Sequence, residues 1–221
     1  MLETLLRKSL LAALELFYGP LAPLYPWLTR IVFGRNWHDW RRSVLPWVSA
    51  TRRVADVGCG PGDLAAELAR PDRCVIAIDR SRSMIALAHR RLARKSGPFS
   101  VYLVCADARH LPLTDGSLDA ITMTFPTAIF LDSRTHAEVA RVLRPGGVFV
   151  AVVSVYPKQW PWWIRPWSPL LWRIIVSREK SSRSMLAVPS LPLLRGQWIR
   201  VEQPTGILEL WVARRVEQDA G

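Results

Sequence analysis

The sequence predicts an α/β fold with a mostly parallel sheet, on three observations. Short apolar runs recur along the chain, at residues 54–57, 74–78, 101–105, 118–123 and 147–154. Amphipathic segments lie between several of these runs, at residues 64–70, 84–94 and 134–143. The first run leads directly into a glycine-rich stretch, VADVGCGPGD at residues 54–63. Continuous apolar strands that alternate with helices are typical of a parallel sheet covered on both faces, so we expect one doubly wound domain.

The composition is that of a folded protein with a basic surface. Half of the 221 residues are apolar and 22% are charged, which is enough for one substantial core. Lys and Arg number 30 against 18 Asp and Glu, giving a formal net charge of +12. That balance suits nucleic acid, an anionic membrane surface or an acidic ligand. The basic residues are scattered, however, so an arginine-biased, solvated surface is an equal alternative.

The cysteines and the N-terminus bear on location. Cys59, Cys74 and Cys105 lie in or beside apolar runs, and we interpret them as small buried residues of a protein in a reduced compartment. They form no CxxC motif and have no metal-ligand spacing, so we expect no metal site. The first seventeen residues carry four charges and no clean cleavage site, and no window of ~20 residues is apolar enough to span a bilayer. We therefore expect a cytoplasmic protein, soluble or bound to the inner membrane surface.

Changes in composition and apolar patterning along the chain divide the single domain into four parts. Residues 1–48 contain an amphipathic helix at 2–17, ended by Gly19 and Pro20, and a Pro- and Trp-rich stretch expected to form short helices or a lid. Residues 49–154 form the predicted core. Residues 155–200 are an insertion rich in Trp, Pro and Arg, and residues 201–221 are a last strand and tail.

The glycine-rich stretch lies where the first strand turns into a helix, which brings a ligand close to backbone N–H groups. Its spacing is GxGxG, because position 63 is Asp, and this differs from the GxGxxG of dinucleotide-binding proteins. No GK[ST] follows, which excludes a P-loop. The turn therefore predicts a nucleoside held against the backbone without a pyrophosphate.

Acidic residues stand at the ends of three successive predicted strands. Asp56 precedes the glycines, Asp79 ends the second strand, and Asp107 follows the third. An acidic residue about twenty positions beyond the first glycine can accept hydrogen bonds from ribose hydroxyls, and carboxyl ends of strands are where open α/β sheets bind ligands. The three carboxylates thus extend the predicted nucleoside site.

Four segments together resemble the Rossmann-like methyltransferases that use S-adenosylmethionine. VADVGCGPGD, AIDRSRSMIALAHRR, CADARHLPLTDGSLDAIT and LRPGGVFVAV are similar to that family's signatures, in its order and spacing. The resemblance covers roughly residues 50–154. It implies a seven-stranded, mostly parallel sheet with an antiparallel last strand, for which residues 207–216 are suited.

The resemblance also implies how S-adenosylmethionine is held. The glycine turn would cradle its methionine part with Asp56 near the amino group, Asp79 would hold the ribose, and Asp107 with the Ala108 N–H would hold the adenine. The full implied set is Tyr18, Tyr25, Asp56, Gly58, Cys59, Gly60, Gly62, Asp79, Arg80, Met84, Asp107 and Ala108. Alternatively, Asp56 caps a helix and Met84 packs in the core instead of against the adenine.

Residues 18–42 resemble the N-terminal signature of the ubiquinone- and menaquinone-biosynthesis methyltransferases. The matching positions are Tyr18, Ala22, Pro23, Tyr25, Gly34, Trp40 and Arg41. Pro26 and Thr29 stand where those proteins usually have Asp and Asn.

Methyl transfer asks mainly for positioning, because the sulfonium is already electrophilic. No strong base constellation is visible, and the candidates are His38 beside Asp39, His110 and His136. His110 is the best placed, since it follows Asp107, although a lone histidine is more often a surface or capping residue. Thr124-Phe125-Pro126 does not match the Asn-Pro-Pro-aromatic signature of amino-methylating relatives, which disfavours adenine or glutamine as the acceptor.

Tryptophans and basic residues interleave in residues 155–180. Trp160, Trp162, Trp163 and Trp167 suit either a membrane interface or the wall of a substrate pocket, and both favour a lipophilic acceptor such as a quinone precursor, a phenol or a lipid headgroup. An RNA-modifying enzyme that uses the basic surface is a second interpretation, although no RNA-binding module is appended. A non-catalytic scaffold that binds the cofactor is a third.

Overall fold

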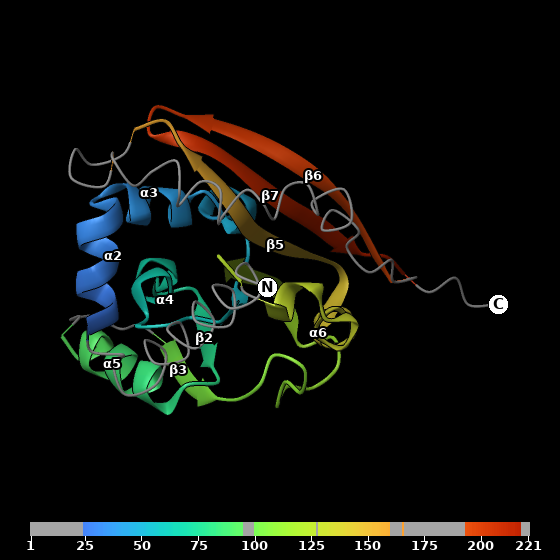
Figure 1. Cartoon of the computed structure of the whole chain (residues 1–221). Coiled ribbons are helices and arrows are strands. Elements are labelled where there is room, and N and C mark those ends of the chain that lie inside the picture. The colour runs from blue at the N-terminus through green and yellow to red at the C-terminus, as the bar shows by residue number, and fades with distance from the viewer. Residues whose placement is uncertain (1–23, 95–99, 127, 160–164, 166–192, 218–221) are drawn as a thin grey trace, which may run out of the picture.

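The computed structural model describes residues 24–94, 100–126, 128–159, 165 and 193–217, and its centre is one seven-stranded sheet. The strands follow the order β3-β2-β1-β4-β5-β7-β6 (Figure 1). Their bounds are Arg53–Val57 (β1), Cys74–Asp79 (β2), Ser100–Cys105 (β3), Leu118–Thr124 (β4), Leu143–Pro157 (β5), Leu194–Gln203 (β6) and Gly206–Arg215 (β7). This confirms the predicted α/β class.

Strand direction also follows the prediction. β1 is central and pairs in parallel with β2 and with β4, so Val54 lies beside Val75 on one side and Ala120 on the other. β3 and β5 extend this parallel arrangement outward. The last strand, β7, runs antiparallel to both of its neighbours, β5 and β6. The carboxyl ends of five parallel strands therefore share one edge of the sheet.

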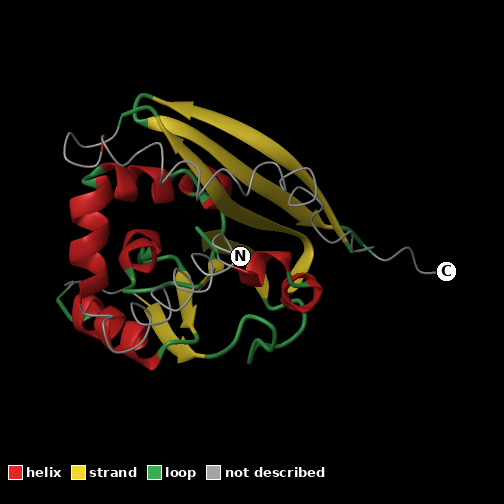
Figure 2. Ribbon diagram, viewed as in Figure 1, coloured by secondary structure: helices red, strands yellow, loops and turns green. Residues whose placement is uncertain are grey.

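Helices cover both faces of the sheet (Figure 2). One face packs against α2 (Tyr25–Phe33), α3 (Asn36–Arg42), the 3₁₀ turn Leu45–Val48, α4 (Asp63–Leu68) and α5 (Arg82–Leu92), around buried residues that include Trp40, Leu64 and Val150. The other face packs against α6 (Ser133–Val142) and the 3₁₀ turn Ala128–Leu131, around Ile121, Phe130 and Phe149. Because alternate strand residues enter different clusters, the strands are apolar on both sides, which explains their continuous apolar runs.

Two strands differ from the pattern read in the sequence. β5 begins four residues before the predicted run and continues to Pro157. β6 begins at Leu194, within the stretch assigned to the insertion, and most of its residues are exposed or half-buried. As the edge of the sheet, β6 is covered too little to require an apolar run. Tyr18, the helix expected at 2–17, and Trp160, Trp162, Trp163 and Trp167 lie outside the described residues. Among the described helices, none is long and apolar enough to cross a membrane.

Candidate functional site

The glycine-rich turn joins β1 to α4 in a conformation that side chains would strain. Gly58, Gly60 and Gly62 have φ angles of 75°, 54° and 78°, in the left-handed region that favours glycine. A Cβ at Gly58 or Gly60 would meet no protein atom within 4 Å, whereas at Gly62 it would lie 2.9 Å from the Cβ of Ala88. Gly62 therefore lets α4 pack on α5, while Gly58 and Gly60 leave bare backbone facing open space.

Asp79 fastens the end of β2 to this turn. Its Oδ2 accepts a hydrogen bond from Gly60 N at 2.9 Å, and its Oδ1 accepts one from Ser81 N at 2.8 Å. Burial raises the pKa of the Asp79 carboxyl, and the two N–H donors oppose that rise. The carboxylate is thus held rigidly beside the glycines, and each oxygen keeps a lone pair for a further donor.

Asp56, the acid that precedes the glycines, is almost completely buried at 1% exposure. Its Oδ1 accepts a hydrogen bond from Thr122 Oγ1 at 2.9 Å, and its Oδ2 has no partner among the described residues. Burial raises the pKa of Asp56 to about 6, against the opposing influence of Arg41 and Thr122. An unsatisfied buried carboxylate oxygen is costly, so this atom suits a cationic ligand group.

Asp107 follows β3 and binds Arg109. Nε and Nη2 of Arg109 donate to the two carboxylate oxygens at 2.9 and 2.5 Å. The bidentate contact holds the pKa of Asp107 well below its usual range. Asp107 is therefore ionised and oriented at the same edge of the sheet as Asp56 and Asp79.

Among the remaining residues of the implied cofactor set, several have buried side chains and could contact a ligand only through their backbone. Met84 and Cys59 are 0% and 2% exposed, so their side chains pack in the core. Burial also raises the pKa of the Cys59 thiol, which keeps it neutral. Ala108 is buried, Arg80 is exposed, and Tyr25 begins α2.

Helix α3 docks the N-terminal segment onto the core through adjacent residues. Trp40 is 1% exposed and donates through Nε1 to Thr205 Oγ1 at 3.0 Å, in the turn between β6 and β7. Arg41 donates to Asp63 Oδ2 at 3.1 Å, and both side chains are more than nine-tenths buried. The two residues therefore hold α3 to the far end of the sheet and to the start of α4.

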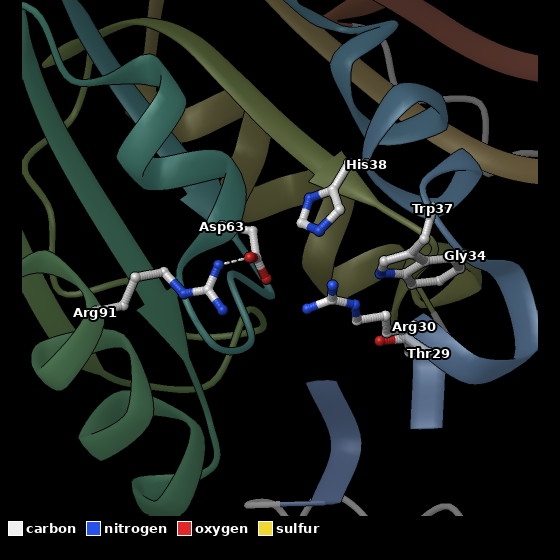
Figure 3. A pocket seen from close by; sticks show the side chains of 7 residues that line it. All are labelled: Thr29, Arg30, Gly34, Trp37, His38, Asp63 and Arg91. Atoms are coloured by element: carbon white, nitrogen blue, oxygen red, sulfur yellow. Dashed lines mark ion pairs between the residues drawn. The ribbon is translucent and has the colours of Figure 1, made fainter. Parts of the chain in front are cut away.

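A cavity of about 270 Å³ lies between this segment and the core, beside the glycine turn. Figure 3 shows its lining, which comprises Thr29, Arg30, Gly34, Trp37, His38, Asp63 and Arg91. Arg91 of α5 forms an ion pair with Asp63. The cavity thus combines α2 and α3 with the first residue of α4 and the outer face of α5.

Trp37 joins this cavity to the carboxyl end of β4. Its ring stacks on Phe125 with centroids 4.4 Å apart, and on Phe33 at 5.2 Å. Phe125 has a φ of 51°, the one positive value among the described residues other than glycine. Such backbone costs about 1–3 kcal/mol and is most often kept at functional sites. Neither Phe125 nor Trp37 was singled out as a site residue from the sequence.

The three candidate histidines lie in different parts of the structure. His38 lines the cavity, and its pKa is lowered by burial and by the charges of Arg41 and Arg91, against Glu67 and Asp39. His110 is exposed after Asp107 and does not line the cavity. His136 is buried on the opposite face, with Nε2 2.5 Å from the carbonyl oxygen of Phe130. Only His38 therefore lies where it can face a ligand in this cavity.

The sheet order, the glycine turn and the acidic strand ends together define a Rossmann-like domain of the methyltransferase type. Residues 54–147 match the family described as "Methyltransferase domain". A solved structure of a protein from Methanococcus maripaludis has the same fold, with a TM-score of 0.57 at 18% identity over 94% of this chain and 92% of that one.

Curated relatives are more similar in sequence. A demethylmenaquinone methyltransferase of Lactiplantibacillus plantarum is 29% identical over 71% of this chain and 71% of its own length. One of Thermus thermophilus is 35% identical over 61% of this chain and 63% of its own. A ubiquinone/menaquinone biosynthesis C-methyltransferase of Geobacter sulfurreducens is 32% identical over 64% and 57%. The last two matches thus span under two thirds of those relatives. The chain is thus similar to methyltransferases over residues 54–147, and it shares their Rossmann-like fold.

Proposed function

We propose that this protein transfers a methyl group from S-adenosylmethionine to carbon of a lipophilic aromatic acceptor of the quinone-precursor class. The observation that carries the proposal is the bare backbone at Gly58 and Gly60, set among Asp56, Asp79 and Asp107 at one edge of the sheet. The activities named for the curated relatives support this choice of acceptor.

The residues present fit the cofactor. The glycine turn has room for the methionine part, and the unpartnered Oδ2 of Asp56 suits its ammonium group. Asp79 would accept from the ribose hydroxyls, and Asp107 with Ala108 would meet the adenine. When bound, the cofactor supplies an electrophilic methyl group. The protein's own task is then to orient the acceptor and to exclude water.

The acceptor would enter beside the glycine turn, against the segment formed by α2 and α3. The cavity there is about 270 Å³, and Trp37 provides an aromatic wall. Nearby, Trp27 of α2 and Leu24, directly before α2, are 65% and 49% exposed. Because Trp favours the membrane interface, we include in the proposal that the protein works in the cytoplasm and contacts the membrane surface, where lipophilic acceptors reside.

Titration calorimetry with S-adenosylmethionine and S-adenosylhomocysteine tests the cofactor site. Asp79→Asn keeps the shape of the side chain but loses the charge and one acceptor, so binding should weaken at least ~tenfold. The matched control is Asp72→Asn, since Asp72 is an exposed carboxylate before the amino end of β2, whereas the turn follows the carboxyl end of β1. Unchanged binding by Asp79→Asn, with the fold intact by circular dichroism, would contradict the proposed site.

Transfer of a labelled methyl group tests the acceptor. Reduced prenylated naphthoquinones in detergent micelles should gain the label on carbon, which mass spectrometry distinguishes from an oxygen-linked methyl group. Labelling of RNA instead would favour the RNA-modifying alternative. Tight cofactor binding without any turnover would favour a scaffold.

A further inference from the structure

The cavity beside the glycine turn carries more positive than negative charge. Arg91 and the buried Arg41 both form ion pairs with Asp63, so a single carboxylate serves two guanidinium groups. The other carboxylates near His38 are Glu67 and Asp39, and neither belongs to the cavity lining. Glu67 is itself paired with Arg42 at 3.1 Å. The two guanidinium groups that contact Asp63 therefore exceed its single negative charge by one.

Arg30 adds a further cation on the opposite wall. It lies in the last turn of α2, and Figure 3 shows its guanidinium directed across the cavity toward Asp63. Within the part of the chain that the structure describes, no carboxylate forms an ion pair with Arg30. A guanidinium presents five N–H donors in a planar fork that matches an oxyanion, so Arg30 is available to a ligand in the cavity.

His38 completes the polar lining between the two walls (Figure 3). Burial and the charges of Arg41 and Arg91 lower the pKa of His38 and favour its neutral form, while Glu67 and Asp39 oppose them. A neutral imidazole can accept the proton of an acidic hydroxyl. The lining therefore offers both a place for an oxyanion and an acceptor for the proton that its formation releases.

The size and the aromatic wall of the cavity limit what the oxyanion can belong to. A volume of about 270 Å³ exceeds what a lone carboxylate fills, and approaches the lower range of small-ligand pockets. Trp37 is fixed between Phe33 and Phe125, so its edge forms a rigid apolar border. A flat ring with one acidic substituent fits this combination better than a small inorganic anion does.

We propose that the methyl acceptor binds as an anion, with its ionised hydroxyl or carboxyl group set against Arg30. This rests on the proposed function and adds the charge state of the acceptor to it. For a hydroxyl acceptor, the O–H bond breaks, its proton passes to Nδ1 or Nε2 of His38, and the electron pair remains on the acceptor, whose ring carbon becomes the nucleophile. With the cofactor bound, the ring carbon would form a bond to the methyl group while the methyl–sulfur bond breaks and leaves its electron pair on sulfur. The ring carbon would then lose its own proton to solvent.

A pair of isosteric probes tests the charge. Naphthoate and naphthamide have the same ring and nearly the same shape, and only naphthoate is anionic. Their dissociation constants are measured by calorimetry with the wild type, with Arg30→Met, and with the matched control Arg35→Met, each with and without S-adenosylhomocysteine. Arg35 is an exposed arginine of the same segment and does not line the cavity.

We expect the wild type to bind naphthoate ~tenfold or more tightly than naphthamide, since hydrogen bonds to charged groups are the stronger ones. Arg30→Met should abolish this preference, and Arg35→Met should keep it. A second arm uses para-nitrophenol, whose phenolate absorbs visible light: its apparent pKa should fall on binding to the wild type but not to Arg30→Met. This arm separates a hydroxyl from a carboxyl acceptor.

Equal affinity for the two naphthalene probes would overturn the proposal, as would a preference that survives in Arg30→Met. If Arg30→Met weakens S-adenosylhomocysteine instead, the anion facing Arg30 is the cofactor's carboxylate and the proposal is also wrong. Failure of the wild type to bind S-adenosylhomocysteine would contradict the proposed function, and the probes measured without it would still decide the charge.

Discussion

Replacing Asp56 by asparagine isolates the free-energy cost of keeping a carboxylate inside the sheet. The side chain is buried, one oxygen is satisfied by Thr122, and the other has no partner among the described residues. Burial raises the pKa of Asp56 from 3.8 to about 6 in the folded protein. Between these two pH values the folded state holds a proton that the unfolded state has lost. The contribution of Asp56 to stability is therefore intact below ~pH 4 and falls as the pH rises toward 6.

The two pKa values differ by roughly two pH units, and each unit corresponds to ~1.4 kcal/mol. Ionised Asp56 should thus cost the free protein about 3 kcal/mol at neutral pH. Asparagine keeps the oxygen that accepts from Thr122 but places an N–H where Oδ2 was, which carries its own cost at every pH. The informative quantity is therefore the pH dependence of the difference between the two proteins.

Urea unfolding of the free protein measures this difference at several values between ~pH 4 and ~pH 7. We expect the wild type to lose about 2 kcal/mol relative to Asp56→Asn over that range, because part of the total change lies below pH 4. Other carboxyls, among them Asp119 and Glu138, have lowered pKa values, so their contribution to stability increases as the pH rises. Both proteins contain these groups, and their contribution therefore cancels in the difference. Asp72→Asn is the control and should follow the wild type. A difference that does not change with pH would refute the reasoning.

Four other substitutions, one of them a control, test the packing around the candidate site by urea unfolding. Gly62→Ala should cost about 2–4 kcal/mol, because φ is positive and the new Cβ would press on Ala88; Gly146→Ala, with positive φ but open space, should cost only about 1–2 kcal/mol, and equal losses would contradict this account. Arg41→Met breaks a buried ion pair and should cost about 3–5 kcal/mol; a neutral result would mean that Arg91 alone satisfies Asp63. Thr205→Val removes the acceptor of Trp40 Nε1 and should cost about 1–2 kcal/mol, and no loss would mean that water replaces it.

The central strands and the acidic strand ends could be predicted because each has a local cause. Strands such as β1 and β4 are buried on both faces, so their sequences are apolar throughout. Asp56, Asp79 and Asp107 stand at fixed offsets from such runs. β6 could not be found in this way, since an edge strand with exposed Arg195 and Gln197 has no apolar run.

The cavity could not be predicted because its residues meet only in the folded chain. In the sequence, Asp63 is notable only for its effect on the glycine spacing, whereas in the structure it binds Arg41 and Arg91 from two other helices. In the sequence, Arg91 is one of several basic residues in the amphipathic segment 84–94. The stacking of Trp37 on Phe125 joins α3 to the end of β4, and no local pattern marks either ring. His38, and not His110, lines the cavity, because the packing of α3 against the core brings His38 there. This packing, too, cannot be seen in the sequence.

Asp63 connects the glycine turn to the wall of the cavity. It is the first residue of α4, directly after Gly62, and it binds one arginine from α3 and another from α5. A ligand that orders the glycine turn therefore fixes a wall of the cavity, and a ligand in the cavity fixes the turn. Linkage then requires that S-adenosylhomocysteine change the affinity for naphthoate by the same factor as naphthoate changes that for S-adenosylhomocysteine. Because Arg41 transmits this contact through a buried pair, Arg41→Met should reduce the shared factor toward one.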